Sequence, residues 1–318
     1  MFNLAFLKNK KKTSLDFSFD RSLYSKELVH CLKQRILETE EARYLLSTFP
    51  PDIQVKFKEC LFEPDNPLTK DILDFMLKNS ETAKIIKRFP GSAEAFEYLY
   101  LAYEQDKVPP VDQYYLKSKA GTQIHRRLIA LRDNIPLWLE KIYKGERLLI
   151  DNVASGPGRD MVEVLKKYPE WKKKVQIRNI DIDPAAVNIG KKLVKENGME
   201  ECFSFECKKY SQADLRQADL IILVGVLCPL PMDVSKRVMK SMRLFSKPGG
   251  LVICSTAQKE LIYDDPLTDF LMKVTGWYMD YKTNQDVLDI LEATGWKPIG
   301  EFYDEPLHHH KMTVARLE

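Results

Sequence analysis

A glycine-rich turn between an apolar run and an amphipathic segment is the part of this chain best suited to chemistry. The apolar residues 148–150 lead into the turn ASGPG at residues 154–158, and the amphipathic sequence MVEVLKKYPEW follows. This order predicts a strand, a tight turn and a helix. Glycines let a backbone approach a ligand closely, and the first N–H groups of a helix point toward it. The turn therefore predicts a site for a nucleotide-like ligand.

An acidic residue at the end of a second apolar segment supports the same site. Residues 175–181 end in Asp181, about 25 positions beyond Gly156. A carboxylate at the tip of the second strand, about 20 residues after the glycines, is where a nucleoside ribose finds an acceptor for its hydroxyls. A dinucleotide is disfavoured, because its site needs a third glycine where this chain has Met161.

Length and charge limit the kinds of partner. A chain of 318 residues, 44% apolar and 30% charged, can form one large or two ordinary globular domains. The net charge of +3, from 49 basic and 46 acidic residues, disfavours a polyanion-binding surface, so we expect no nucleic-acid partner. The densest basic run, residues 8–12, is typical of a solvated tail. The oligomeric state stays open.

The N-terminus and the cysteines indicate a cytoplasmic protein. The first apolar stretch precedes its lysines, the reverse of a signal peptide, and no stretch reaches membrane-spanning length, so we expect no membrane partner. The six cysteines are scattered without a C-x-x-C pair, which is typical of reduced thiols and not of a disulfide framework or a zinc site.

Two kinds of hydrophobic periodicity divide the chain. From residue 21 to 104 apolar residues recur at helical spacing, which predicts about five or six short helices. We expect an all-helical N-terminal domain over residues 1–110, which would supply a lid and the substrate side, and one or more connecting helices over 111–145. From residue 147 onward strands and helices alternate, and this predicts a doubly wound, Rossmann-like α/β domain over 146–318.

The expected elements of this second domain follow from the same periodicity. The run LIILVGV is apolar throughout, as in a strand that is buried on both faces of a parallel sheet. Strands are predicted at residues 147–153, 175–181, 202–207, 220–226, 251–255, 296–303 and 311–316, and helices at 161–171, 184–197, 234–245 and 284–294.

Four motifs in this order resemble the class I S-adenosylmethionine-dependent methyltransferases: ASGPGRD, NIDIDP, ADLIILVGVLCPLP and FSKPGGLVICST. The segments LEATGWKPIGEF and KMTVARL are similar to the last helix and terminal strand pair of that family. The resemblance implies a mostly parallel seven-stranded sheet with an antiparallel last strand. It also implies S-adenosylmethionine as methyl donor, S-adenosylhomocysteine as product and in-line transfer to an acceptor. An Asn-Pro-Pro-Tyr-type tetrad is missing after the fourth strand, which favours a small-molecule acceptor over a nucleic-acid base.

The resemblance places the methionine part of the cofactor at the glycine turn. Gly156 and Gly158 would let the loop pass against it, with Ala154 and Ser155 in the same loop. Ala154 stands where the family has its first glycine. The family's acidic residue falls on Asn152, which keeps an acceptor oxygen for the amino group of the cofactor.

The resemblance places the nucleoside and the sulfonium at the other strand ends. Asp181 would accept hydrogen bonds from the ribose hydroxyls, and Ile182 would flank the adenine. Lys208 follows the third strand and should lie on the far side of the adenine. Gly225 and Val226, at the end of the fourth strand, should face the sulfonium and its methyl group.

Asp151 lies one position before Asn152, and this offset turns its side chain to the opposite face of the strand. Near the expected methyl position Cys228 is predicted as a buried packing thiol. Arg126, Arg127 and Arg132 could bind a carboxylate or phosphate by bidentate pairing, or form a solvated basic helix face.

Catalytic residues are harder to predict, because methyl transfer needs mainly positioning and requires a base only where the acceptor carries a proton. His125, Tyr210 and His309 are the candidates; ordinary packed or surface side chains are the alternative for the histidines. Consecutive histidines at 308–310 point to alternating sides of an extended segment, so they do not converge on one ion and no metal is expected.

Two alternative functions stay open. Nicotianamine-synthase-like enzymes transfer the aminocarboxypropyl group of the same cofactor, and they too have a helical domain before the sheet and a DIDP-type second strand, as in residues 181–184. The loop GPGRD favours the methyltransferases. The second alternative is a non-catalytic S-adenosylmethionine-binding protein, suggested by Asn152 and Ala154.

Overall fold

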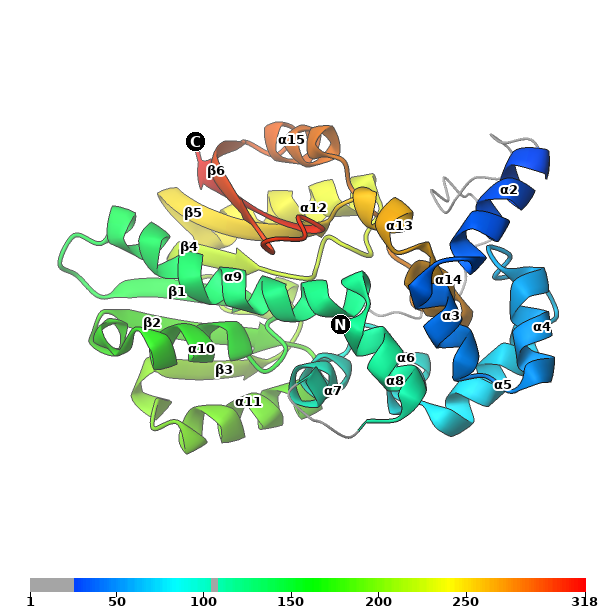
Figure 1. Ribbon diagram of the computed structural model, residues 1–318. Helices are drawn as coiled ribbons and strands as arrows, with labels where there is room; N and C mark the ends of the chain where they lie inside the picture. Colours follow the sequence, from blue (N-terminus) through cyan, green and yellow to red (C-terminus); the bar gives the residue numbers. More distant parts are fainter. Residues whose placement is uncertain (1–25, 104–107) are drawn as a thin grey trace. The chain divides into compact units, whose positions relative to one another are not determined.

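The computed structural model describes residues 26–103 and 108–318, and these form two units (Figure 1). The sheet unit contains Arg126–Lys259 and Met279–Glu318. The helical unit contains the described residues up to His125 together with Glu260–Tyr278. The basic run at residues 8–12 and the apolar stretch before it lie outside the described residues.

The strands of the sheet unit form one seven-stranded sheet within the described residues, in the order β3-β2-β1-β4-β5-β7-β6. Only β7 runs antiparallel to its neighbours β5 and β6; the other paired strands are parallel. The predicted Rossmann-like sheet with an antiparallel last strand is therefore confirmed. The strands are β1 (Leu148–Val153), β2 (Val175–Asp181), β3 (Phe203–Cys207), β4 (Ala218–Leu223), β5 (Ser246–Ala257), β6 (Trp296–Tyr303) and β7 (His310–Leu317).

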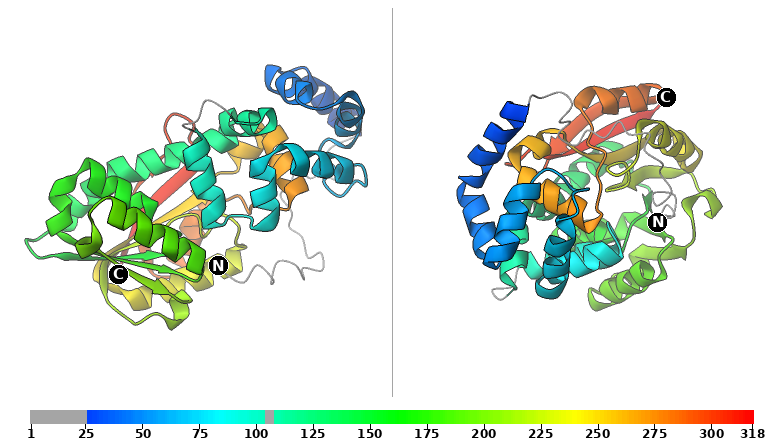
Figure 2. Two further views of the ribbon diagram at one scale, coloured as in Figure 1. Left: turned by 90° about the horizontal axis from the view of Figure 1, so that it is seen from below. Right: turned by 90° about the vertical axis from the view of Figure 1, so that its right-hand side faces the viewer.

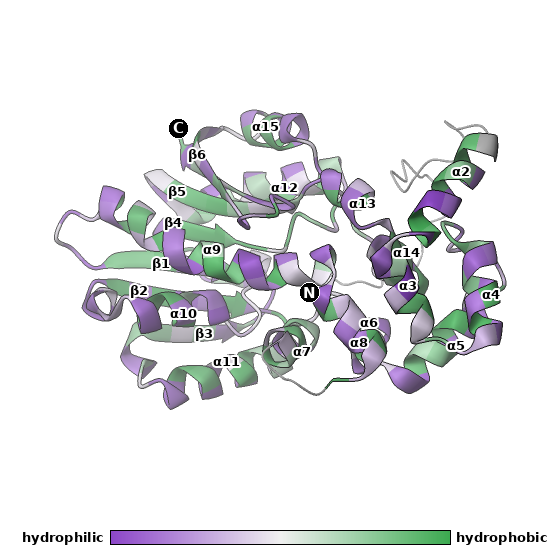
Figure 3. Ribbon diagram, viewed as in Figure 1, coloured by the Kyte–Doolittle hydropathy of each residue, from purple (hydrophilic) through white to green (hydrophobic). Residues whose placement is uncertain are grey.

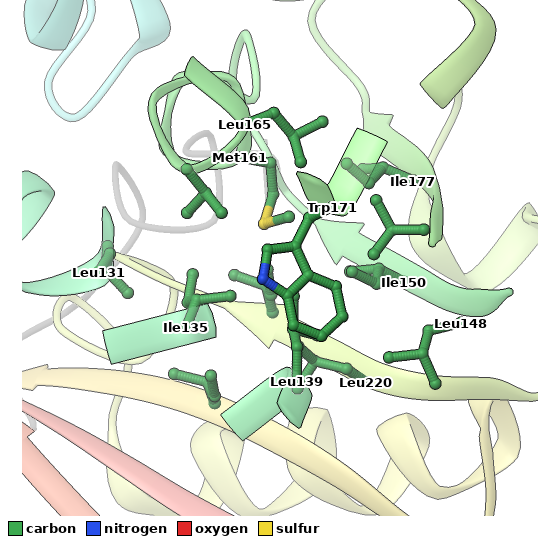
Figure 4. Close-up of a cluster of buried hydrophobic side chains, with 14 of the residues drawn as sticks. Leu131, Ile135, Leu139, Leu148, Ile150, Met161, Leu165, Trp171, Ile177 and Leu220 are labelled. Carbon is green, nitrogen blue, oxygen red and sulfur yellow. The ribbon is translucent and has the colours of Figure 1, made fainter. Parts of the chain in front are cut away.

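One face of the sheet is covered by α9 (Lys119–Ile142) from Arg126 onward, by α10 (Arg159–Lys167) and by α11 (Pro184–Glu196) (Figures 1 and 2). Trp171 lies in the middle of the apolar cluster beneath them, 2% exposed and surrounded by leucine, isoleucine and methionine side chains (Figure 4). Burying each large apolar side chain stabilises the fold by about 1.5–3 kcal/mol.

The opposite face of the sheet packs against α12 (Met232–Met242) and α15 (Asn284–Glu292). Strand β4 shows why the sheet needs helices on both sides: Leu220 and Ile222 enter the first cluster, whereas Ile221 and Leu223 enter the second. The continuous apolar run therefore marks a strand that is buried on both faces, as predicted. In Figure 3 strands β1, β4 and β5 are mainly green, while the helices alternate between purple and green.

Two predicted elements end earlier than expected. The helix predicted over 161–171 is α10 followed by the separate 3₁₀ turn Pro169–Lys173, because proline has no N–H to continue the helix. The strand predicted to reach residue 226 ends at Leu223, since Gly225 has φ +77°, which does not fit a strand.

The helical unit has its own apolar core. Six of its helices lie in residues 26–103, in agreement with the predicted five or six: α2 (Lys26–Leu37), α3 (Glu40–Ser47), α4 (Pro51–Cys60), α5 (Thr69–Asn79), α6 (Glu81–Arg88) and α7 (Ala93–Tyr103). The helical unit also contains α8 (Pro110–Lys117), α13 (Glu260–Asp264) and α14 (Pro266–Thr275). Phe270 of α14 packs edge-on against Phe57 of α4, with ring centroids 5.5 Å apart. Within the described residues, no helix is both long and apolar enough to cross a membrane.

Candidate functional site

The carboxyl ends of β2, β1 and β4 are neighbours in the sheet, and the predicted ligand-binding loops follow them. In doubly wound sheets, ligands bind in the crevice outside these strand ends. We take the residues there as the strand-end site and describe them from β1 outward.

The loop after β1 is held in a conformation that suits glycine. Gly156 and Gly158 have φ of 54° and 72°, and even Ala154 has a positive φ of 51°. A Cβ on Gly158 would lie 2.2 Å from Nδ2 of Asn179, a fully buried side chain of β2. A Cβ on Gly190 of α11 would lie 2.6 Å from the carbonyl oxygen of Pro157. The loop is therefore fixed between β2 and α11.

Asp181 joins this loop to β2 through its carboxylate. Oδ2 accepts a hydrogen bond from the backbone N–H of Gly156 at 2.8 Å, and Oδ1 accepts one from the N–H of Asp183 at 2.9 Å. A carboxylate offers about four acceptor positions, which is the chemistry that ribose hydroxyls require of a partner. Asp183 in turn caps α11 by accepting from the N–H of Ala185 at 2.9 Å.

Asn152 points toward the first turn of α10. Its Nδ2 donates to Oδ1 of Asp160 at 2.9 Å, and the same oxygen accepts from the N–H of Met161 at 2.8 Å. Burial raises the pKa of Asp160, while these two hydrogen bonds and the charge of Arg127 act in the opposite direction. Asp160 is a site residue that the sequence reasoning missed, although it is the last letter of the motif ASGPGRD.

Asp151 faces away from this loop, as its one-residue offset implied. Its fully buried carboxylate forms ion pairs with Arg178 at 2.6 Å and with Arg216 at 2.7 Å. Arg178 also pairs with Glu206 of β3 at 3.0 Å. Asp151 therefore holds strands together and is not available to a ligand at the loop.

The ends of β4, β5 and β7 form a second polar group. Oγ of Ser255 accepts from the N–H of Gly225 at 2.8 Å and lies 3.2 Å from Nε2 of His310. The same nitrogen is 3.7 Å from Sγ of Cys228. The backbone N–H of His310 donates to Oδ1 of Asp304 at 2.7 Å. This group comes from segments far apart in the chain, and sequence reasoning missed Ser255 and His310.

Burial determines the charge state of this second group. His310 is 3% exposed, and burial together with the nearby charge of Arg127 holds its pKa well below the ordinary value. Burial also raises the pKa of the Cys228 thiol. At neutral pH the ends of β4, β5 and β7 thus carry a neutral imidazole and a neutral thiol.

Three arginines were candidates for binding an anion, and their surroundings differ. Arg126 is exposed, and Arg132 forms an ion pair with Asp133 at 2.7 Å. Arg127 is 6% exposed, and its Nη1 lies 3.5 Å from the position of a Cβ on Gly225. Only Arg127 of the three therefore has a buried guanidinium beside the end of β4.

The three predicted catalytic residues are not brought together in the sheet unit. His309 is buried, and its carbonyl accepts from the N–H of Gln258 at 2.8 Å. Tyr210 begins the 3₁₀ turn Tyr210–Gln212 and packs against the apolar cluster that contains α12. His125 belongs to the helical unit, where its ring stacks on Tyr103 with centroids 4.3 Å apart. Their catalytic roles stay predictions.

The remaining predicted residues lie at or after strand ends. Ile182 follows β2 and is half-buried, and Ser155 lies in the glycine loop. Lys208 follows β3 and pairs with Glu206 at 3.3 Å, and Val226 is 8% exposed. In residues 26–103 and 108–318 no group of three or more His, Cys, Asp or Glu side chains is arranged to hold a metal ion.

The sheet order, the glycine loop and Asp181 at the end of β2 define a Rossmann-like methyltransferase fold. The model of a family described as putative methyltransferase matches residues 89–305, which is more than half of the chain. The chain belongs to this methyltransferase family, and the predicted family resemblance is confirmed.

Solved structures share the fold at low sequence identity. A possible exported protein from Bordetella parapertussis aligns with a TM-score of 0.63 and 15% identity, over 88% of this chain and 97% of that one. Magnesium protoporphyrin IX methyltransferase from Synechocystis PCC 6803, crystallised with S-adenosylhomocysteine, aligns with a TM-score of 0.54 and 16% identity, over 75% and 100%. The pyocyanin biosynthetic protein PhzM aligns with a TM-score of 0.51 and 16% identity, over 92% of this chain and 84% of that one. Comparison with curated protein sequences returned no match.

Proposed function

We propose that this protein transfers the methyl group of S-adenosylmethionine to a small-molecule acceptor. One observation carries the proposal: Asp181 at the end of β2 accepts a hydrogen bond from the N–H of Gly156 and so places a carboxylate against the glycine loop. Membership of a methyltransferase family supports the same reaction. The methyltransferase from Synechocystis, which shares the fold, was crystallised with S-adenosylhomocysteine.

The reaction we propose is an in-line displacement, in which the acceptor attacks the methyl carbon as the bond to sulfur breaks. The sulfonium supplies the activation when the donor is bound, so the protein has to hold donor and acceptor in line. Asp181 and the glycine loop would fix the nucleoside, and Gly225 at the end of β4 would leave room for the sulfonium and methyl group.

A small-molecule acceptor is supported by charge and by the sequence after β4. The segment Cys228-Pro-Leu-Pro replaces the Asn-Pro-Pro-Tyr-type tetrad, and the net charge is only +3. We also propose that the helical unit serves the acceptor side, since the chain enters α13 directly after the carboxyl end of β5. All six cysteines are free, which supports a cytoplasmic location.

Calorimetry tests the cofactor, and product analysis tests the reaction. We expect both S-adenosylmethionine and S-adenosylhomocysteine to bind; binding of neither would overturn the proposal. Turnover that leaves S-adenosylhomocysteine supports methyl transfer. Formation of methylthioadenosine would instead show aminocarboxypropyl transfer, and binding without turnover over a panel of acceptors would favour a non-catalytic role.

Replacing Asp181 by alanine tests the ribose contact. Loss of hydrogen bonds from the ribose to this carboxylate should weaken S-adenosylhomocysteine binding by about 1.5–3 kcal/mol. The matched control is Asp219→Asn at the opposite end of the sheet, where Asp219 accepts from the N–H of Leu149 at 2.8 Å. An Asp181→Ala variant that binds as tightly as the control would remove Asp181 from the site.

A further inference from the structure

Trp277 of the helical unit is a buried side chain whose polar atom has no partner in the described part of the chain. The residue is 7% exposed, and within residues 26–103 and 108–318 its indole N–H makes no hydrogen bond. Trp296 of the sheet unit shows the usual situation, since its indole N–H donates to the carbonyl of Met239 at 2.9 Å. A buried donor without such a partner indicates a place where an acceptor atom of a ligand can bind.

The end of α14 fixes the position of this indole. Gly276 has φ +90° and closes the helix, with its N–H bonded to the carbonyls of Met272 and Lys273. The next N–H, that of Trp277, donates to the carbonyl of Met272 at 2.8 Å. The Trp277 ring packs edge-on against Phe96 of α7, with ring centroids 5.8 Å apart. The indole is therefore held by the backbone of the turn and by an aromatic neighbour.

Two glycines leave space beside the indole. A Cβ on Gly91, in the turn between α6 and α7, would lie 3.9 Å from Nε1 of Trp277. A Cβ on Gly276 would lie 3.9 Å from Nζ of Lys87. Among the described residues, apart from the two chain neighbours of each glycine, no other heavy atom would lie within 4 Å of either Cβ. The indole nitrogen and the ammonium therefore both lie beside open space at a glycine.

Lys87 brings a positive charge to this turn. It lies in the last turn of α6, is exposed and forms no ion pair with any described residue. Its neighbours on α6 differ in this respect, because Arg88 lies 3.9 Å from Glu94 and Lys84 pairs with Glu81 at 3.0 Å. An ammonium without a carboxylate partner, together with an indole N–H, favours a ligand with anionic oxygens.

Aromatic rings continue from the indole along α7. Phe96 and Tyr100 lie one turn apart on this helix, with ring centroids 6.5 Å apart and planes at 29°, and both are half-buried. Phe89, in the turn before α7, is 43% exposed. Aromatic rings pair favourably with a further ring in stacked or edge-to-face geometry. The ligand that matches this part of the helical unit is therefore aromatic as well as anionic.

We propose that Lys87, Gly91, Phe96 and Trp277, which we call the indole site, bind the methyl acceptor, and that this acceptor is a planar aromatic carboxylate. This rests on the proposed function, because it gives the acceptor of the helical unit a chemical class. One carboxylate oxygen accepts from the indole N–H of Trp277 and the other from the ammonium of Lys87. The ring of the ligand packs beside Phe96, and Gly91 leaves room for it.

A ¹H–¹⁵N spectrum of the full chain tests the indole contact, with 2-naphthoate as the probe. The chain has four tryptophans, and the indole signal that is missing from Trp277→Phe is that of Trp277. Millimolar 2-naphthoate should shift this signal, because a carboxylate polarises the N–H, and should leave those of Trp171 and Trp296 in place, since both are buried in the sheet unit. An unmoved Trp277 signal would overturn the proposal. Trp277→Tyr gives the assignment if Trp277→Phe fails to fold.

Three probes of similar size separate the charge from the ring. 2-Naphthoate has both, 2-naphthamide lacks the charge, and decahydronaphthalene-2-carboxylate lacks the aromatic ring. Calorimetry should show that each of the last two binds about 2- to 10-fold more weakly than 2-naphthoate. Equal affinities for 2-naphthoate and 2-naphthamide would overturn recognition of a carboxylate, and equal affinities for the two carboxylates would overturn recognition of an aromatic ring.

Lys87→Met tests the ammonium. Its loss should weaken the binding of 2-naphthoate about 2- to 5-fold, because an exposed ion pair contributes little, and should leave 2-naphthamide unchanged. The control is Lys84→Met, one turn earlier on α6, whose ammonium pairs with Glu81 at 3.0 Å and which should change the binding of neither probe. A Lys87→Met variant that loses stability but binds both probes as before would make Lys87 a structural residue at the end of α14.

S-adenosylhomocysteine binding to the same protein separates this proposal from the proposed function. Protein that binds S-adenosylhomocysteine while 2-naphthoate leaves the Trp277 signal unmoved would keep the proposed function and lose the indole site. Protein that binds 2-naphthoate at Trp277 but does not bind S-adenosylhomocysteine would lose the proposed function, and with it the role of the indole site in holding a methyl acceptor.

Discussion

The half of the strand-end site at β1 and β2 is made by one continuous piece of chain, whereas the half at β4, β5 and β7 is assembled from distant ones. In the first half, Asn152, Gly156 and Asp181 belong to consecutive elements from β1 to β2, and backbone N–H groups supply most of the hydrogen bonds. In the second half, Gly225, Ser255 and His310 meet only because three strands are neighbours in the sheet.

The two halves therefore owe their geometry to different physical causes. The first half is prepared by backbone conformation, through positive φ angles and close contacts that leave no room for a Cβ. The second half is prepared by burial, which keeps His310 neutral and fixes Ser255 between a backbone N–H and an imidazole. Substitutions should therefore act on the first half through sterics and on the second half through protonation and hydrogen bonding.

The largest effect is expected from Gly158→Ala in the first half. The new Cβ would lie 2.2 Å from Nδ2 of the fully buried Asn179, and φ at this position is +72°. Overpacking and a left-handed residue together should cost about 3 kcal/mol in the free energy of unfolding. Urea denaturation measures this loss. Gly198→Ala is the matched control, because φ is +60° there but nothing lies within 4 Å of the Cβ. Equal losses in the two variants would show that the contact with Asn179 adds nothing.

Asp304→Asn tests whether burial controls the second half. Burial raises the pKa of Asp304 from 3.8 to about 6 in the folded protein, where Oδ1 accepts from the N–H of His310. The folded state therefore holds this proton more tightly than the unfolded chain, and stability falls as pH rises from about 4 to 6. Asparagine keeps the acceptor and does not titrate, so the variant should be more stable by up to about 3 kcal/mol above pH 7.

Urea denaturation at pH 4, 6 and 8 measures this difference. We expect the two proteins to be equally stable near pH 4 and to diverge as the pH rises. Glu305→Gln is the control, since Glu305 is the exposed neighbour and its loss should not change the pH dependence in this way. A constant difference between Asp304→Asn and the unsubstituted protein at all three pH values would contradict the raised pKa.

The smallest effect is expected from Ser255→Ala. The hydroxyl accepts from the N–H of Gly225 at 2.8 Å and lies within hydrogen-bond distance of Nε2 of His310, at 3.2 Å. Removing it leaves both groups without this partner, which should cost about 1–2 kcal/mol of stability. The ¹⁵N shifts of His310 should also change, because Nε2 loses this hydrogen bond. The control is Ser241→Ala on α12, a half-buried serine whose hydroxyl donates to the carbonyl of Arg237 in the same helix; it should leave the shifts of His310 unchanged. Identical shifts in Ser255→Ala and the unsubstituted protein would contradict a hydrogen bond between Ser255 and His310.

The two halves of the strand-end site also differ in how much of them could be predicted from the sequence. The first half carries local signals: glycines at fixed offsets, an acid at a strand end and an apolar run on either side. The strands of the sheet could also be predicted, because their hydrophobic periodicity is a local signal of the same kind. Asp160 was missed because the resemblance directed attention to Asn152, and the bond between the two side chains depends on the angle at which α10 leaves the loop.

The second half could not be predicted, because it depends on strand register. Sequence favoured His309, whereas His310 is the histidine that faces the end of β4, since β7 begins there with His310 opposite Ala257. No local pattern distinguishes two adjacent histidines before the register is known. The contact between Phe270 and Phe57 could likewise not be predicted, because the two residues are distant in sequence and meet only in the folded helical unit.

The close contacts around the glycine loop also have an evolutionary consequence. Gly158 leaves room for Asn179, and Gly190 leaves room for the carbonyl of Pro157, so one short loop is wedged between a strand and a helix. A larger residue at position 158 would require a smaller one at 179, and a larger residue at 190 would require the loop to shift. In relatives of this chain we therefore expect these positions to covary, and redesign of the loop should change them together.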